Sequence, residues 1–580
     1  MSSDKPNILV NTEQWRMTDE SIAALQSSDD IFQCNGMLSR ILTDAYKKDG
    51  VTFEDGTPRI GRLPAPTLSE TLSKKARYYS LKRDKKTKKQ YEREEYPPAC
   101  TVQQVLSRGS WPGIRPLTGV VEYPVLRADG SVLQTPGYDE KSGLLYLPSA
   151  KFPTVPERPT RDQALAAITT LLYLVQDFPF VQPAHRSGWL AGVLTIFCRF
   201  AIDGCIPLFL IDADSAGSGK TLLASLGAVI ATGRDMPGMV PTDDQEEMRK
   251  RLFSLAMNGA RMVLIDNITG VVGGAALNMV LTRRSIEDRV LGRNDIVEVI
   301  WNAIVSATCN NGRVATDTHR RSIYSRIESG IERPEDREGF KISDLPAYVK
   351  EHRAEYACAA LTILRAYAVY LEDGGKHPSM KTMGSFNPWS AAVRAPIIWL
   401  EQPDPYLATV EWRDQTDTTA QSIGQLLRGW KELCDNVGKP SITAAQALGH
   451  LTEDERRCEV SKRDHHRDHE QPLPSLRWTT LRSVLEPIAS GRPTSKQLGE
   501  LMSASKGRVV DEMRLEQDGK EHSAIRWKVA IMPTSAADPK PYTKPNGQHK
   551  HCEHCGERVD GYNVCVECGY GADPTVMGQA

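Results

Sequence analysis

The sequence has no uninterrupted apolar run long enough to cross a membrane. Its longest candidate, residues 189–211, is interrupted by Arg199 and Asp203, so we expect a buried helix and strand there. The first residues, MSSDKPNILVN, do not have the form of a signal peptide, and no fixed-period repeat is apparent. We therefore expect a cytoplasmic protein with no membrane partner.

An excess of charge of one sign is also lacking. The 580 residues include 72 Lys and Arg and 73 Asp and Glu, which excludes a protein that coats polyanions with its whole surface but allows a local basic face. Eight of the twelve cysteines are scattered singly and four cluster near the C-terminus, which indicates a reducing compartment and one metal site. The length predicts several domains.

The most informative segment that is present is PLFLIDADSAGSGKT, residues 207–221. An apolar strand, a loop of small residues ending in Gly-Lys-Thr and a helix with apolar spacing predict a P-loop that binds ATP. Backbone N–H groups and the helix N-terminus bind the phosphates, Lys220 reaches the β- and γ-phosphates, and the Thr221 hydroxyl binds Mg²⁺. Asp214 stands where the first glycine of the motif is expected. The predicted nucleotide-binding residues are Asp214, Ser215, Ala216, Gly217, Ser218, Gly219, Lys220 and Thr221.

A second acidic strand is expected to complete the Mg²⁺ site. The apolar run MVLID ends in Asp266, which we predict to hold Mg²⁺ through water. The next residue is Asn267, whereas a glutamate there would activate the attacking water. Either hydrolysis is slow or another carboxylate acts as the base. Glu246 and Glu247 are the candidates, and we take Glu247 as the catalytic one.

Two further patterns follow this strand. The segment VEVIWNAIVSATCNN predicts a strand that leads to Asn310, a polar sensor of the γ-phosphate. In DTHRRSIYSRIE, Arg320 and Arg321 stand where an arginine finger would reach the nucleotide of a neighbouring subunit, the alternative being a surface salt bridge. Between the motifs, SIEDRVLGRNDIVEVI predicts a hairpin in which Arg289 and, at the tip, Arg293 would contact DNA.

The C-terminal part is predicted to contain a winged-helix domain, a Pro-rich linker and a zinc ribbon. Residues 438–532 are predicted as a winged-helix domain, with a wing that turns at Asp518-Gly519. Its DNA contacts would include Lys506 and Arg508, although a winged helix can instead bind only protein. The highly charged residues 453–471 are predicted as a loose linker. Further positive charge for phosphate contacts is predicted at Arg482, Lys496, Arg526 and Lys528.

A zinc ribbon is predicted at residues 552–570, after a Pro-rich linker over 533–551. Two C-x2-C pairs separated by nine residues place four thiolates around one tetrahedral zinc ion. A closed four-thiolate site has no position for a substrate, so this zinc is expected to be structural. The predicted ligands are Cys552, Cys555, Cys565 and Cys568.

The N-terminal residues 1–155 have the pattern of an α+β region. Short strands separated by turns are expected, with a hairpin signal at Asp129-Gly130. The basic run KRDKKTKK, residues 82–89, favours a solvated loop over a contact with a phosphate backbone. No acidic triad or metal-binding triplet indicates primase chemistry in this region.

Taken together, the motifs resemble the AAA+ ATPases of phage and mobile-element replication proteins, which are related to superfamily III helicases. The matching text is LFLIDADSAGSGKTLLA, EEMRKRL, VLIDN, DRVLGR, ATCNN and DTHRRSIYSRIE. Asp214, Asn267 and Cys309 depart from the pattern. The resemblance implies an α/β P-loop core over 156–331 with its preceding helices, and a helical lid over 332–437. These stand beside the α+β N-terminal region, the winged helix and the zinc ribbon.

The resemblance also implies an activity. We expect an ATP-dependent DNA helicase or translocase that acts in phage, prophage or plasmid replication in the cytoplasm of a bacterial host. Catalysis would fall to Lys220, Asp266, Asn310 and the two arginines, with ATP and Mg²⁺ as cofactors and Zn²⁺ in the ribbon. A hexameric ring would hold single-stranded DNA in its channel and work with replication proteins such as a primase. Two alternatives are a loader or remodeller of replication proteins, and a DNA-binding regulator with an ATP-controlled assembly switch.

Overall fold

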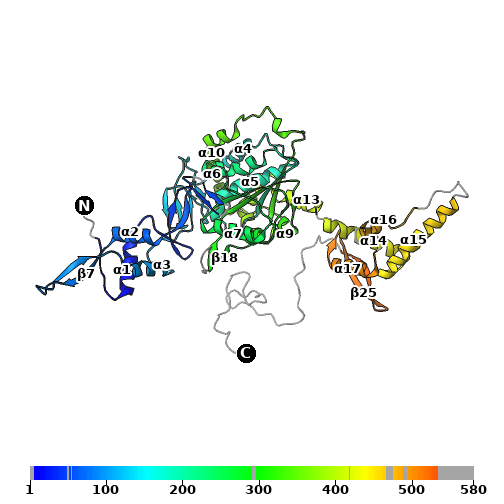
Figure 1. Ribbon diagram of the computed structural model, residues 1–580. Helices are drawn as coiled ribbons and strands as arrows, with labels where there is room; N and C mark the ends of the chain where they lie inside the picture. Colours follow the sequence, from blue (N-terminus) through cyan, green and yellow to red (C-terminus); the bar gives the residue numbers. More distant parts are fainter. Residues whose placement is uncertain are drawn as a thin grey trace, which may run out of the picture. The chain divides into compact units, whose positions relative to one another are not determined.

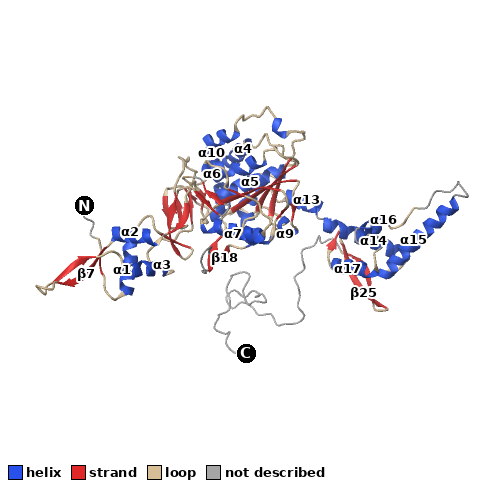
Figure 2. Ribbon diagram, in the orientation of Figure 1, coloured by secondary structure: helices blue, strands red, loops and turns tan. Residues whose placement is uncertain are grey.

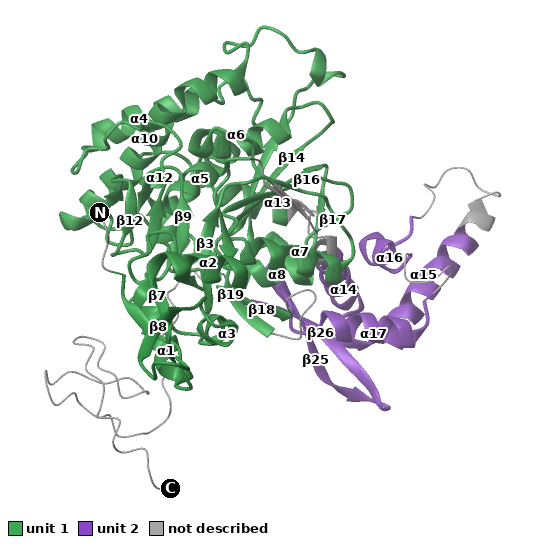
Figure 3. Cartoon of the chain, turned by 60° about the vertical axis from the view of Figure 1, so that its left-hand side comes forward, with its two compact units in different colours: residues 1–417 green, residues 418–580 purple. Residues whose placement is uncertain are grey.

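The computed structural model describes residues 5–48, 51–53, 55–289, 296–416, 418–465, 475–486 and 493–532. The chain forms two compact units, Met1–Asp417 and Thr418–Ala580, which Figure 3 colours separately. Within the part of the chain that is described, no helix combines the length and apolarity that a membrane span requires.

The first part of unit 1 is a small α+β region with its own core. Three helices, α1, α2 and α3, pack around a core that includes the fully buried Trp111. Two three-stranded sheets accompany them, with strand orders β1-β7-β8 and β2-β3-β6. The helices are α1 (Gln14–Leu25), α2 (Ala65–Lys75) and α3 (Ala99–Ser107). The strands are β1 (Asn7–Leu9), β2 (Phe32–Cys34), β3 (Met37–Leu42), β6 (Arg59–Arg62), β7 (Arg77–Arg83) and β8 (Gln90–Glu94).

Five short strands follow and lead to the central sheet. The expected turn at Asp129-Gly130 is present, because β10 and β11 pair antiparallel on either side of it and Gly130 has a φ of 78°. The other three strands form one sheet of order β12-β13-β9. The strands are β9 (Gly119–Val121), β10 (Val125–Leu126), β11 (Val132–Leu133), β12 (Gly137–Asp139) and β13 (Leu144–Tyr146).

The central sheet of unit 1 has the order β22-β14-β20-β16-β15-β5-β4. The five strands from β22 to β15 run parallel, and β5 joins β15 antiparallel from the N-terminal region. Side chains of β14 alternate between two cores, since Phe209 and Ile211 face one and Leu208 and Leu210 face the other. The strands are β4 (Tyr46–Lys48), β5 (Val51–Phe53), β14 (Leu208–Ala213), β15 (Gly238–Met239), β16 (Met262–Ile268), β20 (Ile304–Asn310) and β22 (Ser322–Ile327).

Helices cover both faces of this sheet (Figures 1 and 2). Residues of α4, α5, α6 and α10 share one core with the sheet, whereas α7 and α8 contribute to the other. The helices of this part are α4 (Arg161–Tyr173), α5 (Pro183–Cys198), α6 (Lys220–Thr232), α7 (Gln245–Met257), α8 (Ala275–Thr282), α9 (Thr316–His319), α10 (Leu345–Glu372), α11 (Asn387–Trp389), α12 (Ala395–Trp399) and α13 (Leu407–Thr416). Two small strand pairs lie outside the sheet: β17 (Val271–Val272) with β21 (Arg313–Val314), and β18 (Ser285–Arg289) with β19 (Ile296–Ile300).

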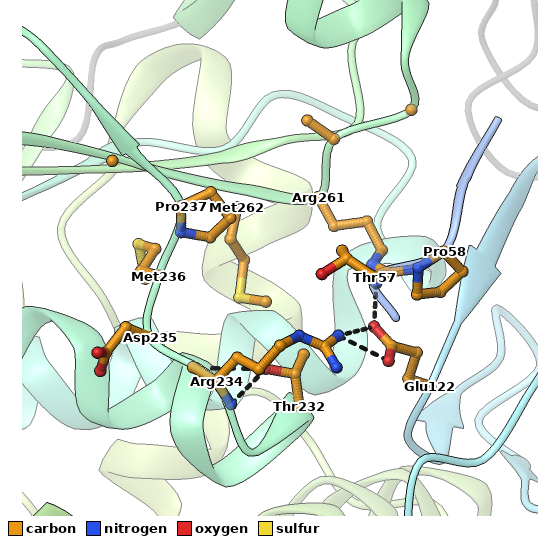
Figure 4. Close-up of a pocket in the computed structure, with 13 residues that line it drawn as sticks. Thr57, Pro58, Glu122, Thr232, Arg234, Asp235, Met236, Pro237, Arg261 and Met262 are labelled. Carbon is orange, nitrogen blue, oxygen red and sulfur yellow. Dashed lines mark hydrogen bonds and ion pairs between the residues drawn. The ribbon is translucent and has the colours of Figure 1, made fainter. Parts of the chain in front are cut away.

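A buried carboxylate joins the N-terminal region to the central sheet (Figure 4). Glu122 follows β9 and is 3% exposed, and both its oxygens accept from Arg234, at 2.6 and 2.7 Å. Arg261 donates to the same carboxylate at 3.1 Å. These residues border a cavity of about 120 Å³ at the N-terminal ends of β15 and β16. Since a P-loop lies at the carboxyl ends of parallel strands, this cavity is at the opposite edge of the sheet.

Unit 2 combines helices with an antiparallel sheet of order β23-β26-β25-β24. Helix α14 belongs to this unit, because Leu427 and Trp430 are buried in its core. The loose linker predicted over 453–471 is wrong over its first part, because α15 continues to His465 and buries Asp454 against Arg457 and Arg482. The elements are α14 (Thr418–Val437), β23 (Ile442–Thr443), α15 (Ala444–His465), α16 (Thr479–Leu485), α17 (Ser495–Ser505), β24 (Val509–Val510), β25 (Met513–Glu521) and β26 (Ala524–Ile531).

Candidate active site

The loop between β14 and α6 has the backbone of a phosphate-binding loop. Gly217 and Gly219 have φ values of 74° and 86°, a left-handed conformation that favours glycine. The space is less restrictive than the backbone: a Cβ at Gly219 would lie 3.2 Å from the Phe178 ring, and one at Gly217 would lie 2.8 Å from the end of the flexible Glu335 side chain. Helix α6 begins at Lys220, so its first N–H groups point into this loop.

Lys220 is held at the centre of the loop. Its ammonium group donates to the Ser215 carbonyl at 2.8 Å, to the Ser218 hydroxyl at 3.1 Å and to Asn310 Oδ1 at 2.6 Å. The residue is 7% exposed, and burial lowers the pKa of the ammonium group despite the nearby carboxylates. Lys220 therefore links the P-loop to the predicted sensor Asn310 at the end of β20.

Thr221 and Asp266 lie side by side, as a Mg²⁺ site requires. The Thr221 hydroxyl is 2.9 Å from Asp266 Oδ1, and Thr308 of β20 donates to the same oxygen at 2.6 Å. Strand β20 lies between β14 and β16, which brings the three side chains to one edge of the sheet. A hydroxyl and a carboxylate are ligands that Mg²⁺ prefers, so the residues present fit that ion.

Asn267 adopts a strained backbone beside this pair. Its φ is 55°, a value that Asn tolerates better than most residues, and its N–H donates to the Thr308 hydroxyl at 2.7 Å. Its side-chain oxygen accepts from Asn310 Nδ2 at 3.4 Å. Glu247, the predicted base, lies on α7 and forms an ion pair with Arg251 at 2.8 Å. The structure thus places the Asn267 amide against the predicted sensor Asn310, while Glu247 is engaged with Arg251.

A buried charge network behind the loop escaped the sequence analysis. Asp212 of β14 is 1% exposed and accepts from Tyr324 at 2.8 Å, from Arg326 at 2.6 Å and from the Gly312 N–H at 3.2 Å. Arg326 also donates to Asn311 Oδ1 at 2.8 Å. The one sequence signal for this network was the acidic residue inside the apolar strand LFLIDA. A buried carboxylate needs a hydrogen-bonding or charged partner, so such a residue indicates a buried polar network.

This network reaches the P-loop backbone. The Asn311 side chain donates to the Asp214 carbonyl at 3.0 Å, and the Asn311 N–H donates to the Ala213 carbonyl at 2.9 Å. Asp214 therefore has its backbone oxygen fixed at the position where the motif would have a glycine. Cys309, the other departure in β20, is fully buried, and burial together with Asp212 raises the pKa of its thiol.

The two predicted finger arginines follow α9, at the start of β22. Arg320 is 63% exposed and pairs with Asp317, whereas Arg321 is 16% exposed and lies 2.6 Å from the other oxygen of Asp317. Of the two, Arg320 is the side chain that solvent or another chain can reach.

A larger cavity borders the P-loop itself. It has a volume of about 360 Å³ and lies against Gly217 and Gly219. Phe178 and Phe340 contribute aromatic surface, and the Arg337 guanidinium lies over the Phe340 ring at 5.2 Å. No local sequence pattern marks this cavity, because its walls come from segments on either side of the P-loop strand.

The predicted DNA-contact residues lie outside this site. The hairpin expected around Arg289 is confirmed by the pairing of β18 with β19, in which Arg289 faces Ile296, but Arg293 lies outside the described residues. In unit 2, Lys506 donates to Gln517 at 3.0 Å and Arg508 is exposed. Arg482 is turned inward, since it pairs with Glu455 and Asp454, and is not available for phosphate.

The predicted zinc ligands Cys552, Cys555, Cys565 and Cys568 also lie outside the described residues. Within the described ranges, no group of three or more His, Cys, Asp or Glu side chains is placed to hold a metal ion. The zinc site therefore stays a prediction.

Among known proteins, the chain is distantly similar to solved structures. No protein-family model and no curated protein matches the chain. Among solved structures, the apo A form of the NrS-1 C-terminal region is 13% identical, with coverage of 78% of this chain and 96% of that one and a TM-score of 0.35. The active helicase Cch of SCCmec type IV is 11% identical, with coverage of 87% and 97% and a TM-score of 0.32. These scores are low, so the two structures carry no argument for the function proposed below.

Proposed function

We propose that this protein is an ATP-dependent DNA helicase or translocase of the AAA+ type. One observation carries the proposal. Lys220 donates to Asn310 and Thr221 donates to Asp266, and these two pairs, from three separate segments of the chain, lie together at the carboxyl edge of the parallel sheet, linked through Asn267 and Thr308. Packing of a hydrophobic core alone does not explain a buried lysine and a hydroxyl–carboxylate pair at the carboxyl ends of these strands.

In this proposal the chain's own groups act on ATP as follows. Lys220 leaves its contacts with Ser215 and Asn310 to neutralise charge on the β- and γ-phosphates. Thr221 and Asp266 hold Mg²⁺, which supplies charge neutralisation between the phosphates when bound. Asn310 orients the γ-phosphate. Glu247 remains the proposed base, and its ion pair with Arg251 has to open for that role.

The 360 Å³ cavity next to Gly219 is the proposed site of the adenine base. Its position against the loop that would hold the phosphates gives the nucleotide a continuous path. Phe178 and Phe340 offer flat apolar surfaces on which a purine can stack. The expected replication role, in phage, prophage or plasmid, is part of the same proposal.

The ring and the DNA path extend the proposal to several copies of the chain. The exposed Arg320, with Arg321, would act as a finger in trans on a neighbouring subunit of a hexamer. The β18–β19 hairpin would carry Arg289 and Arg293 to single-stranded DNA in the channel. The helices and hairpin of unit 2 would form a winged helix that contacts DNA through Lys506 and Arg508, and the C-terminal cysteines would hold structural zinc.

Strand displacement on forked DNA tests the proposal. The wild type is expected to displace the strand only with ATP, and Lys220→Ala to lose both hydrolysis and displacement. Arg293→Ala is expected to lose displacement and DNA-stimulated hydrolysis but to keep basal hydrolysis. Arg283→Ala, an exposed arginine before the hairpin, is the matched control. Near wild-type ATP turnover by Lys220→Ala would refute the assignment of the P-loop.

A second function is favoured by Asn267. An amide beside Asp266 cannot take a proton from the attacking water, so hydrolysis would be slow unless Glu247 reaches the site. A slow ATPase suits a DNA-binding regulator that uses ATP to control assembly, or a loader that remodels replication proteins. Absence of strand displacement together with ATP-dependent oligomerisation of the wild type would favour these alternatives.

A further inference from the structure

The basic run at residues 82–89 lies at the end of a β-ribbon formed by β7 and β8. The two strands pair antiparallel from Tyr79 opposite Glu94 to Arg83 opposite Gln90. The turn that joins them spans residues 84–89 and is ordered by Asp84, whose carboxylate accepts from the N–H of Lys86 at 2.9 Å and of Thr87 at 2.6 Å. These bonds lower the pKa of Asp84. The segment expected to be a loop is therefore an ordered turn at the end of a ribbon that projects beyond α1–α3 (Figure 2).

Charge is segregated along this ribbon. At its base, Arg77 pairs with Glu92 at 2.9 Å and with Glu94 at 3.1 Å, and Arg93 lies 3.8 Å from Glu95. At its tip, six of the eight residues from 82 to 89 are Lys or Arg and one is Asp. In the described structure none of these six cations forms an ion pair. The tip thus concentrates positive charge on a chain whose net charge is −1.

The four lysines of the turn are all available to a ligand. Lys85, Lys86, Lys88 and Lys89 are exposed or nearly so, and the Arg83 side chain braces the turn by donating to the Lys88 carbonyl at 3.0 Å. Tyr91 faces Lys82 across the ribbon and is 51% exposed. The turn is ordered by its own hydrogen bonds, and its cations stand apart from the glutamates of the same ribbon.

We propose that this ribbon tip is a second DNA-binding element, which contacts the phosphate backbone of duplex DNA independently of the ATPase site. The major groove admits a two-stranded β-ribbon, and its walls carry closely spaced phosphates. The side chains that the turn exposes are mainly cations, so binding is electrostatic and indifferent to base sequence. The choice of DNA as the polyanion rests on the proposed function. The exposed basic tip itself is observed independently of that function.

Binding of the full chain to a random-sequence duplex, without nucleotide, tests this inference. Lys85, Lys86, Lys88 and Lys89 are replaced together by Ala, and the control variant has Ala at Lys151, Lys350, Lys376 and Lys381, which removes the same charge from other exposed positions. Affinity is measured by fluorescence anisotropy from about 50 to about 200 mM salt. The ribbon variant is expected to bind at least about tenfold more weakly, with a salt slope smaller by up to about 3.6, since each of four phosphate contacts contributes about 0.9. Restoration of binding by Arg at the four positions supports a role of charge.

Three results would overturn the inference. One is unchanged affinity and salt slope in the ribbon variant, and another is an equal loss in the control variant. The third is loss of binding to phosphatidylserine-containing vesicles with duplex affinity retained, which would assign the tip to an anionic membrane. ATP hydrolysis without DNA should be equal in all variants. If no ATP-dependent strand displacement occurs but the ribbon variant still loses duplex affinity, the proposed function fails and the ribbon inference stands.

Discussion

The Arg326 guanidinium lies 2.6 Å from the buried carboxylate of Asp212, across two adjacent parallel strands. The same guanidinium reaches Asn311, which in turn holds the Asp214 carbonyl of the P-loop. An interior ion pair thus supports the loop from behind. The pair fixes the position of the loop even though the first glycine of the motif is replaced.

Removal of the buried charge tests this support. Asp212→Asn keeps the shape of the side chain but leaves Arg326 without its buried counter-ion, and the loss of one partner of such a pair costs on the order of 3 kcal/mol. We expect a lower free energy of unfolding in urea and weaker nucleotide binding. Glu328→Gln, which removes the exposed partner of the same arginine, is the control and should cost less than about 1 kcal/mol. Equal effects of the two variants would contradict a special role of Asp212.

A second prediction concerns Gly312, just after the sensor strand. A Cβ at this position would collide with the Cys309 sulfur, which is itself fully buried. Gly312→Ala is therefore expected to destabilise unit 1 by about 1–3 kcal/mol, and Cys309→Ala in the same chain to recover part of the loss. Gly499→Ala in α17 meets open space and should be neutral or stabilising. Thermal unfolding measures the stability of all three variants. An unchanged stability of Gly312→Ala would show that the segment around Gly312 can shift without a loss of stability, and would contradict the prediction.

The arginines after α9 give a prediction about assembly. A finger that acts in trans contributes roughly 10³ to 10⁵ to turnover, so the double variant Arg320→Ala, Arg321→Ala should be nearly inactive. Mixing it with Lys220→Ala subunits should restore partial activity, because some interfaces then combine an intact P-loop with an intact finger. Absence of complementation, together with a monomeric mass in the presence of ATP, would count against a ring.

Loss of the predicted zinc ribbon is expected to leave ATP hydrolysis largely unchanged. Metal analysis of the full chain is expected to find one Zn²⁺, held by Cys552 and its three partners. Deletion of residues 534–580 should leave ATP turnover largely intact, because the cluster of Lys220, Thr221 and Asp266 lies within unit 1. Reactive free thiols at all four cysteines in the untreated protein would exclude the zinc site.

The sequence by itself predicted the parts of the candidate site that depend on local order. A strand, a glycine loop and a helix must follow one another to make a P-loop, so Lys220 and Thr221 were identifiable from their neighbours alone. The β18–β19 hairpin was equally local, since its two strands are close in sequence and pair with each other. Charge alone misled at 453–465, because Asp454 is satisfied by Arg482, which lies far along the chain.

Only the tertiary structure decided which distant residues meet. Strand order places β20 between β14 and β16, and this order brings Thr308 and Asn310 to Asp266 and Lys220. The partners of Asp212 come from β22, more than a hundred residues away, and no local pattern specifies them. The basic run at 82–89 is local in sequence, but its separation from the glutamates depends on the ribbon register. This register sets Glu92 opposite Leu81, and Glu92 forms its ion pair with Arg77 instead of with a lysine of the tip. Local chemistry therefore fixed the loop, whereas burial and strand order fixed what surrounds it.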